Sequence, residues 1–227
     1  MATHLDLEEQ EQLDQLKHFW KQYGNLVTWL LIAALGAYAA FNGWTWWQRD
    51  QSAKASAMYD ELDRAAQAGD TERTTRIFAD LKERFPRTAF AQQGGMLAAK
   101  LQADKGQADP ARATLTWVAE HGVEAEYQTI ARIRLAGLLL DQKKYDEALK
   151  QLDAAAPTKE FEGLVADRRG DILLAQGKKD DAKAAYQKAW AALDPKLEYR
   201  RLLEAKLTAL GAPPEADKAK TAAEAAK

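Results

Sequence analysis

The segment "RGDILLAQGKKDDAKAAYQKAW" (residues 169–190) overlays on "LAGLLLDQKKYDEALKQLDAAA" (residues 135–156) with an offset of 34 residues. The overlay pairs Ala136 with Gly170, Leu139 with Leu173, Ala148 with Ala182, Leu152 with Tyr186, and Ala155 with Ala189. Repetition at a fixed period of this length is typical of chains that stack helical units. One such pair could arise by chance in an alanine-rich helical bundle, but several matched positions together favour a repeat array.

The residue types suit units of two helices joined by a turn, and 34 residues is the tetratricopeptide period. A small residue in the first helix, Ala136 or Gly170, lets the second helix approach closely. An alanine early in the second helix, Ala148 or Ala182, faces that contact. We therefore predict an all-α repeat domain, a tetratricopeptide-like α-solenoid.

Turn positions extend the pattern in both directions. Gly177 marks the turn of the last unit, and Lys143 occupies the equivalent place one unit earlier. Residues 97–118 supply Ala99, Gly106, Ala111 and Leu115 in the same roles, at an offset of about 37 residues. Residues 59–86 supply Gly69 as turn, Phe78 as space-filler and Pro86 as closing residue. Leu62 and Thr74 stand where small residues are expected, so this copy is degenerate.

The array is expected to end in a capping helix over residues 197–210. This helix would place Leu202, Leu203, Leu207 and Leu210 on one face, and Arg200, Arg201, Glu204 and Lys206 on the other. Residues 211–227 contain two prolines and no large apolar side chain, which predicts a disordered tail.

A second kind of segment precedes the repeats, "LVTWLLIAALGAYAAFNGWTWWQRD" (residues 26–50). Between Lys21 and Arg49 there is no charged side chain, and about 20 apolar residues suffice to cross a bilayer. Aromatic residues suited to the headgroup level flank it at Trp20, Tyr23, Trp44, Trp46 and Trp47. Small residues recur along this segment and could let a neighbouring helix approach closely; they are Ala33, Gly36, Ala37, Ala40 and Gly43.

Two other interpretations of this segment are a cleaved signal peptide and a buried core helix. "AYA" at residues 37–39 resembles a cleavage site, but the preceding region is acidic where a signal peptide is basic. The favoured organisation is a short polar N-terminal segment (1–25), a transmembrane helix (26–47), the tetratricopeptide-like repeat domain (48–210) and the disordered tail (211–227).

Charge and cysteine content exclude some function classes. The formal net charge is −2, from 32 basic and 34 acidic residues, so no basic field predicts nucleic-acid binding. The absence of cysteine excludes disulfides and thiolate chemistry. Two basic residues precede the apolar segment closely and three follow it, at Lys17, Lys21, Arg49, Lys54 and Arg64. This balance leaves the orientation undecided.

No constellation of catalytic residues stands out, so we predict that the protein is not an enzyme and has no cofactor or metal. The histidines His4, His18 and His121 are far apart, and we expect His121 to contact carbonyls at a helix C-terminus. The segment "QQGGM" (92–96) lacks the lysine of a phosphate loop and predicts a close helix contact. The carboxylates expected to be solvated on a charged helix face are Asp171, Asp180 and Asp181.

The binding face is expected on the first helices of the repeats that match the 34-residue pattern most closely. Stacked helix pairs form a superhelix whose concave face can receive an extended segment or a partner helix. Arg132, Arg168 and Arg169 are the candidate groove residues, because guanidinium groups can hold backbone carbonyls or acidic partners. A solvated face without a partner is the alternative.

The combination of segments resembles a known family. It consists of "QLKHFWKQYGN", an apolar helix ending in "NGWTWWQRDQ", and the repeats "RLAGLLLDQKKYDEAL" and "VADRRGDILLAQGKKDDAKAAYQKA". This combination resembles the ancillary SecYEG translocon subunit family, the YfgM-like proteins of Gram-negative bacteria, over roughly residues 10–210. The resemblance implies a single-pass inner-membrane protein with a cytoplasmic N-terminus and a periplasmic repeat domain.

The resemblance also implies partners. These are the SecYEG translocon, a membrane-anchored periplasmic prolyl-isomerase-like chaperone, unfolded secreted proteins and membrane lipid. The expected function is a membrane-tethered scaffold that helps hand emerging secreted proteins to periplasmic chaperones. The alternatives are a stress-regulatory adaptor that sequesters one dedicated partner, and an assembly factor that uses the array as a docking wall.

Overall fold

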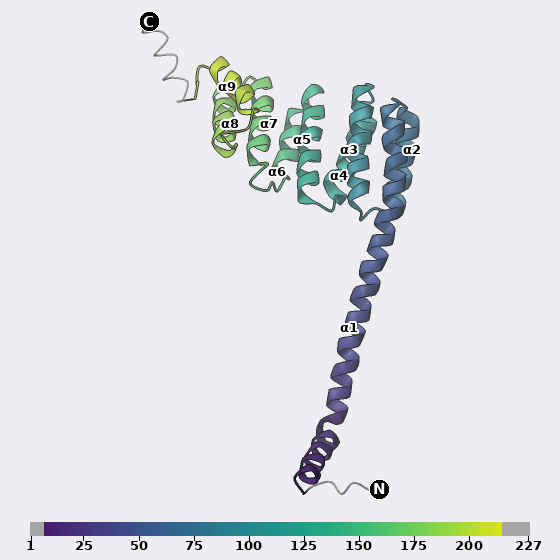
Figure 1. Ribbon diagram of the computed structural model, residues 1–227. Coiled ribbons are helices and arrows are strands. Elements are labelled where there is room, and N and C mark those ends of the chain that lie inside the picture. Colours follow the sequence, from purple (N-terminus) through teal and green to yellow (C-terminus); the bar gives the residue numbers. More distant parts are fainter. Residues whose placement is uncertain (1–6, 215–227) are drawn as a thin grey trace. The chain divides into compact units, whose positions relative to one another are not determined.

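The computed structural model describes residues 7–214, and within that range it contains helices and their connections but no strand (Figure 1). The helices are α1 (Leu7–Gln67), α2 (Thr71–Arg84), α3 (Ala89–Asp104), α4 (Ala108–His121), α5 (Ala125–Asp141), α6 (Tyr145–Asp153), α7 (Glu162–Ala175), α8 (Lys179–Ala192) and α9 (Arg200–Ala209). The described chain divides into two compact units, with the boundary between residues 51 and 52, and α1 contributes to both. The all-α prediction is confirmed.

The first unit contains the apolar part of α1. In the part of the chain that the structure describes, α1 is the one helix long and apolar enough to cross a membrane. Its most apolar window has a mean hydropathy of 1.6, and only 6% of that window is buried inside the protein. Trp29, Leu35 and Phe41 are 65%, 66% and 70% exposed. The core-helix interpretation is therefore wrong, because these side chains have no protein interior around them.

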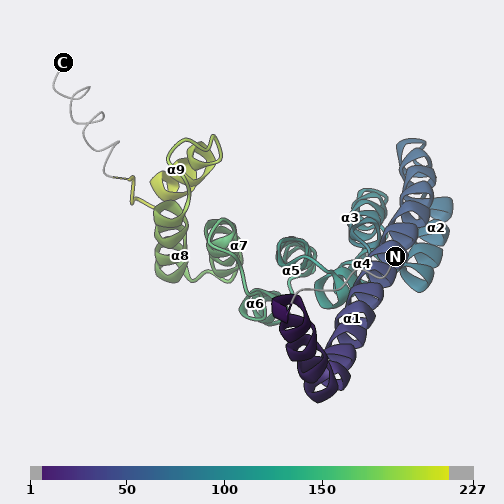
Figure 2. The ribbon, with the colours of Figure 1, turned by 60° about the horizontal axis from the view of Figure 1, so that its bottom comes forward.

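The second unit stacks antiparallel helix pairs. Figure 2 shows α3, α5 and α7 in one layer of a curved array, and α4 and α6 in a second layer below them in this view. Each helix packs on the next one along the chain from α2 to α9. The last part of α1 belongs to this unit as well, since Ala55, Leu62 and Ala65 are buried in a core shared with residues of α2 and α3.

Left-handed backbone conformations mark the repeat boundaries. Positive φ angles occur at Gly69 (70°), Gly106 (73°), Lys143 (59°), Gly177 (78°) and Gly211 (69°). These positions are 37, 37, 34 and 34 residues apart, which are the offsets of the sequence repeat. Glycine adopts this conformation without steric cost, whereas lysine does not. The turn assigned to Lys143 from its place in the repeat is confirmed.

The predicted small contacts lie where the paired helices meet. Ala136, Ala148 and Ala182 are fully buried. A Cβ atom on Gly170 would lie 2.4 Å from Cε1 of Tyr186, so only glycine admits the tyrosine ring at this position. Close packing of this kind leaves little room for larger side chains.

The degenerate first repeat packs differently from the later ones. Leu62 and Thr74 are fully buried although they are larger than the residues expected there. The small residues lie instead on α3, where added Cβ atoms on Gly94 and Gly95 would come within 2.8 Å of Leu81 and 2.5 Å of Val118. The close helix contact predicted for residues 92–96 is confirmed.

The helix α9 caps the array, with two corrections to its expected faces. Leu203 and Leu207 are buried against α8, but Leu202 is 49% exposed. Lys206, expected on the solvated face, is bonded to carboxylates of α7. The apolar stripe is narrower than predicted because α9 covers only one neighbouring helix pair.

The end of the described chain follows this cap. Ala212 packs against the core of the last repeat, and Pro214 is buried. The remainder of the predicted tail, residues 215–227, lies outside the described residues.

Candidate functional site

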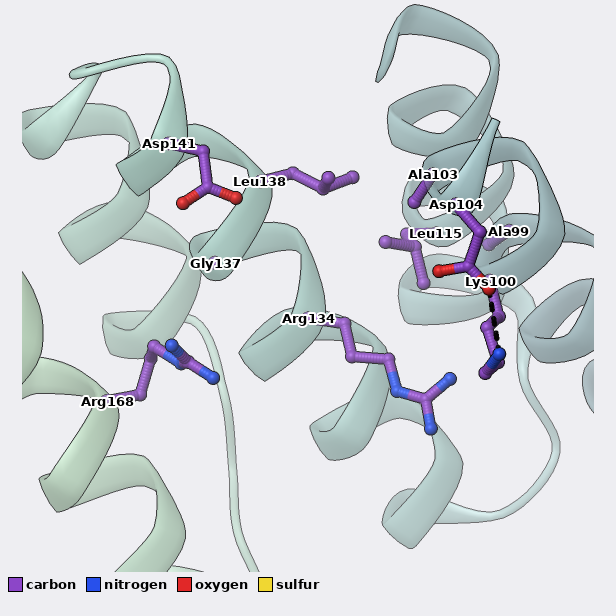
Figure 3. Close-up of a pocket in the computed structure, with 10 residues that line it drawn as sticks. All are labelled: Ala99, Lys100, Ala103, Asp104, Leu115, Arg134, Gly137, Leu138, Asp141 and Arg168. Carbon is purple, nitrogen blue, oxygen red and sulfur yellow. Dashed lines mark hydrogen bonds and ion pairs between the residues drawn. The ribbon is translucent and has the colours of Figure 1, made fainter. Parts of the chain in front are cut away.

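A pocket of about 340 Å³ opens on the inner layer of the array, between α3, α5 and α7 (Figure 3). Its lining combines small or apolar residues, which we call the floor, with charged residues, which we call the walls. The floor residues are Ala99, Ala103, Leu115, Gly137 and Leu138. The charged residues are Lys100, Asp104, Arg134, Asp141 and Arg168. This composition suits a ligand that lies on an apolar base and presents polar groups to the sides.

Helical spacing brings these side chains to one face. Arg134, Gly137, Leu138 and Asp141 occupy positions i, i+3, i+4 and i+7 of α5, which share a face of an α-helix. Lys100, Ala103 and Asp104 do the same on α3. Since α3 and α5 lie in the same layer, their two charged faces border one groove (Figures 2 and 3).

The charges in the pocket are incompletely paired. Nζ of Lys100 lies 2.8 Å from Oδ2 of Asp104, but both side chains are more than half exposed. Such pairs contribute about 0.2–1 kcal/mol and open easily. Within residues 7–214, neither the Arg134 nor the Asp141 side chain has a hydrogen-bond or ion-pair partner. These two groups are therefore available to a ligand.

Arg168 is the half-buried cation of the pocket. Its Nη1 lies 3.4 Å from Oδ2 of Asp171, and its Nε is buried without an acceptor among the described residues. Its guanidinium carbon lies 3.7 Å from where a Cβ of Gly137 would be. A buried donor without a partner carries a desolvation cost.

The three arginines predicted as groove residues do not lie together. Only Arg168 lines this pocket. Arg132 is half-buried and donates to the backbone oxygen of Ala119 and to Oε1 of Gln151. Arg169 pairs with Asp153 and lines a separate pocket of about 260 Å³ between α6, α7 and α8.

Sequence reasoning missed Arg134, Asp104 and Asp141, although the repeat contained a signal for them. Arg134 and Arg168 are 34 residues apart, so they occupy equivalent positions in successive units. Asp104 and Asp141 are 37 residues apart and are equivalent in the same way. Charges that recur at the repeat period on the inner helices would have identified the groove.

A buried polar network lies beside the pocket and ties α9 to α7. Asp167, which is 3% exposed, accepts hydrogen bonds from the hydroxyl of Tyr199 at 2.5 Å and from Nζ of Lys206 at 2.7 Å. Asp171 accepts from the same Nζ at 2.6 Å and from the hydroxyl of Tyr186 at 2.9 Å. Asp171 was expected to be solvated, and that expectation is wrong because α8 and α9 cover it.

The network changes the acidity of both tyrosines. Burial, followed by the hydrogen bond to Asp171, raises the pKa of Tyr186 well above its usual value of about 10. Burial and the hydrogen bond to Asp167 raise the pKa of Tyr199 in the same way. A phenolate beside these carboxylates would be repelled by them, so the phenols remain hydrogen-bond donors.

Other predicted residues have clear positions. Nδ1 of His121 lies 3.1 Å from the carbonyl oxygen of Trp117, which confirms its place at a helix C-terminus. Asp180 and Asp181 are exposed. Among the described residues there is no group of three histidines, cysteines or carboxylates that could hold a metal ion.

The predicted membrane-facing residues are exposed along α1. Trp20, Tyr23, Trp44, Trp46 and Trp47 are between 43% and 71% exposed. An added Cβ on Gly36 or Gly43 would meet nothing within 4 Å, so this face is open. Ala33, Ala37 and Ala40 are exposed as well.

Comparisons with known proteins agree with this architecture. Residues 17–212 match the family model described as tetratricopeptide repeat-like domain. A protein of Neisseria gonorrhoeae named ancillary SecYEG translocon subunit is 34% identical over 216 residues, covering 92% of this chain and 100% of the relative. Proteins of the same name from Haemophilus influenzae and Escherichia coli are 27% and 25% identical, covering 81% and 79% of this chain and 89% and 85% of the relatives.

Among solved structures, the chain is similar to MamA 41-end from Desulfovibrio magneticus RS-1. The TM-score is 0.51 with 20% sequence identity, over 75% of this chain and 90% of that chain. At this identity the similarity concerns the fold alone.

Proposed function

Because this chain belongs to the family of ancillary SecYEG translocon subunits, we propose that it associates with the SecYEG translocon and binds segments of emerging secreted proteins in the concave pocket of its repeat array. The observation that carries this proposal is the pocket between α3, α5 and α7, whose charged walls are incompletely paired. In this function the array helps to hand its clients to periplasmic chaperones.

The apolar helix supplies proximity in this proposal. Tethering the array beside a channel raises its effective concentration near an emerging chain to the millimolar range. Weak, exchangeable contacts are then sufficient, and exposed charged side chains make contacts of that strength. A client held weakly is also easily released to the next protein.

The proposed orientation has a cytoplasmic N-terminus and a periplasmic repeat domain. It follows the family resemblance, since the basic residues around the span are balanced. A membrane-anchored periplasmic prolyl-isomerase-like chaperone is the second proposed partner, on the same basis. Membrane lipid contacts the aromatic residues at both ends of the apolar stretch.

Recognition of the translocon is assigned to the open small-residue face of α1. Gly36 and Gly43 would let a neighbouring helix approach closely. Exchanging residues 26–47 for an unrelated apolar helix of equal length tests this assignment by co-purification of the translocon. Lost association supports it, whereas retained association places recognition in the array or the aromatic flanks.

Photocrosslinking in living cells tests the client-binding role. A photoreactive residue at Leu138, on the floor of the pocket, should capture many secreted proteins. The same residue at Lys150, exposed on α6 in the outer layer, is the matched control and should capture few. Capture of one dedicated protein at Leu138 would favour the stress-regulatory adaptor. Equal capture at the two positions would contradict binding in the concave pocket.

A further inference from the structure

We propose that the concave pocket selects extended segments carrying one acidic and one basic side chain about three residues apart. The acidic side chain lies at the Arg134–Arg168 end of the pocket and the basic side chain at the Asp141 end. This inference rests on the proposed function, because it names the class of segment that the same pocket binds.

Two rows of opposite charge carry the argument. Arg134 and Arg168 are equivalent residues of successive repeats, as are Asp104 and Asp141. Asp104 is already paired with Lys100, so Asp141 is the carboxylate left for a basic side chain of the bound segment. Since the helix pairs are antiparallel, α3, α5 and α7 run in the same direction, and equivalent residues lie at the same height. Figure 3 shows the two arginines towards one end of the pocket and Asp141 towards the other, with Gly137 between them.

The positive end has a guanidinium that the fold leaves without a carboxylate. In the last repeat, Asp171 lies three residues after Arg168 and accepts from it. One repeat earlier, the position equivalent to Asp171 is Gly137, so Arg134 has no such acceptor. Gly137 also gives room to the Arg168 side chain, which lies against it. Two cations therefore border the same stretch of α5.

The negative charge beside Arg168 is itself shared. Asp171 accepts from Lys206 and Tyr186 in addition to Arg168. The buried Nε of Arg168 remains without an acceptor in the described part of the chain. Arg168 also lines the pocket, where a carboxylate of a bound segment would form a charge-assisted hydrogen bond with the exposed part of its guanidinium, stronger than a neutral one.

The spacing follows from helix and strand geometry. Arg134 and Asp141 are seven residues apart on α5, which is about 10 Å along a helix axis. An extended chain covers that length in about three residues at about 3.3 Å each. Leu115 and Leu138 line the pocket between the two ends, so the residues between the two charges should be small or apolar.

Peptide binding to the full-length protein in lipid nanodiscs tests the selection. The probes are fluorescein-labelled 12-residue peptides that share one Ser/Ala host sequence. Two of them carry Asp and Lys three residues apart, one in each order. The others carry adjacent Asp and Lys, two Asp, or two Lys. We expect the better of the two three-apart peptides to bind about tenfold more tightly than the adjacent, two-Asp and two-Lys peptides, since two exposed ion pairs contribute a few-fold each. The preference should shrink as salt screens the charges.

Charge reversal identifies the residues responsible. Arg134→Glu should abolish the preference for the mixed-charge peptide and favour the two-Lys peptide. Adding Asp141→Lys should restore the mixed-charge preference, because the two ends have then exchanged sign. Lys150→Glu on α6 changes the net charge equally but lies outside the pocket, and it should leave the preference unchanged.

The possible failures are distinguishable. If all peptides bind within about twofold of one another, or if none binds, charge selection is wrong, while capture of secreted proteins at Leu138 would still support the client-binding role. If Leu138 captures no secreted protein, the client-binding role itself fails. A Lys150→Glu effect as large as that of Arg134→Glu would show that net charge, and not the pocket, sets the preference.

Discussion

Lys206 of α9 and Asp167 of α7 form an ion pair with 2.7 Å between Nζ and Oδ1, although the Asp167 side chain is only 4% exposed. A carboxylate in such a position requires a charged or hydrogen-bonding partner, because burying an unpaired charge is very costly. Lys206 provides it from 39 residues further along the chain. The capping helix is therefore held to the array by a specific polar contact as well as by Leu203 and Leu207.

Removing this cation should destabilise the end of the array. Lys206→Met keeps most of the side-chain volume but leaves Asp167 without its charge partner, and we expect a loss of about 3 kcal/mol or more in the free energy of unfolding. Lys188→Met, at an exposed position of α8, should change it by less than about 0.5 kcal/mol. Urea denaturation followed by circular dichroism measures both. Similar midpoints for the two variants would contradict a structural role for the pair.

The helix contact inside the last repeat should not tolerate a large side chain. Ala182 is fully buried between α7 and α8, so Ala182→Trp should cost about 1–3 kcal/mol or more by overpacking. Ala184→Trp, two residues later on the exposed side of α8, is the matched control and should be nearly silent. Thermal denaturation of the two variants makes the comparison, and equal melting temperatures would place Ala182 outside the contact.

The left-handed turn at Lys143 offers a stabilising substitution. Its φ of 59° is strained for a residue with a Cβ, so Lys143→Gly should raise the free energy of unfolding by about 1 kcal/mol. The reciprocal change Gly177→Lys should lower the free energy of unfolding by a similar amount. An added Cβ at Gly177 would meet no atom within 4 Å, so the cost comes from the positive φ alone. Chemical denaturation tests the pair. The prediction fails if both substitutions change stability in the same direction.

The raised pKa values of Tyr186 and Tyr199 predict a loss of stability in alkaline solution. In the unfolded chain these phenols ionise near pH 10, whereas the folded chain keeps them protonated. Their stabilising contribution is therefore complete below about pH 10 and decreases as the pH rises further, because the unfolded state then binds fewer protons.

Denaturation midpoints between pH 8 and pH 11 test this dependence. In Tyr199→Phe, the fall in stability above about pH 10 should be shallower than in the unmodified protein. Tyr145→Phe, which lies outside the network, should retain the original slope. Parallel curves for the unmodified protein and Tyr199→Phe would mean that this hydroxyl does not couple folding to pH.

The natural absence of cysteine makes the topology directly measurable. Single cysteines at Ala184 of the array and at Gln15 before the apolar stretch provide one label on each side of the proposed membrane span. In intact spheroplasts, a membrane-impermeant maleimide should label the cysteine at position 184 and reach the one at position 15 only after permeabilisation. The opposite pattern would reverse the proposed orientation, and release of a soluble product would reinstate the signal peptide.

Local patterns were sufficient to predict the helix pairs, their turns and the apolar helix. Ala136 and Ala182 could be placed because small residues at a fixed period identify close helix contacts. The turn at Lys143 could be placed without a glycine, because the period supplied its position. The apolar stretch of α1 was recognisable because hydropathy is a property of the segment itself.

The groove and the cap depended on information that no segment contains alone. Arg132 and Arg134 are two residues apart on α5 and thus point about 200° apart around its axis. Only the packing of α5 against its neighbours decides that Arg134 faces the pocket and Arg132 does not. The pairing of Asp167 with Lys206 likewise joins residues on α7 and α9. The sequence by itself determined the repeating unit and the apolar character of α1, because both arise from neighbouring residues. The tertiary structure alone decided which charges are paired, because ion pairs between helices depend on how those helices are stacked.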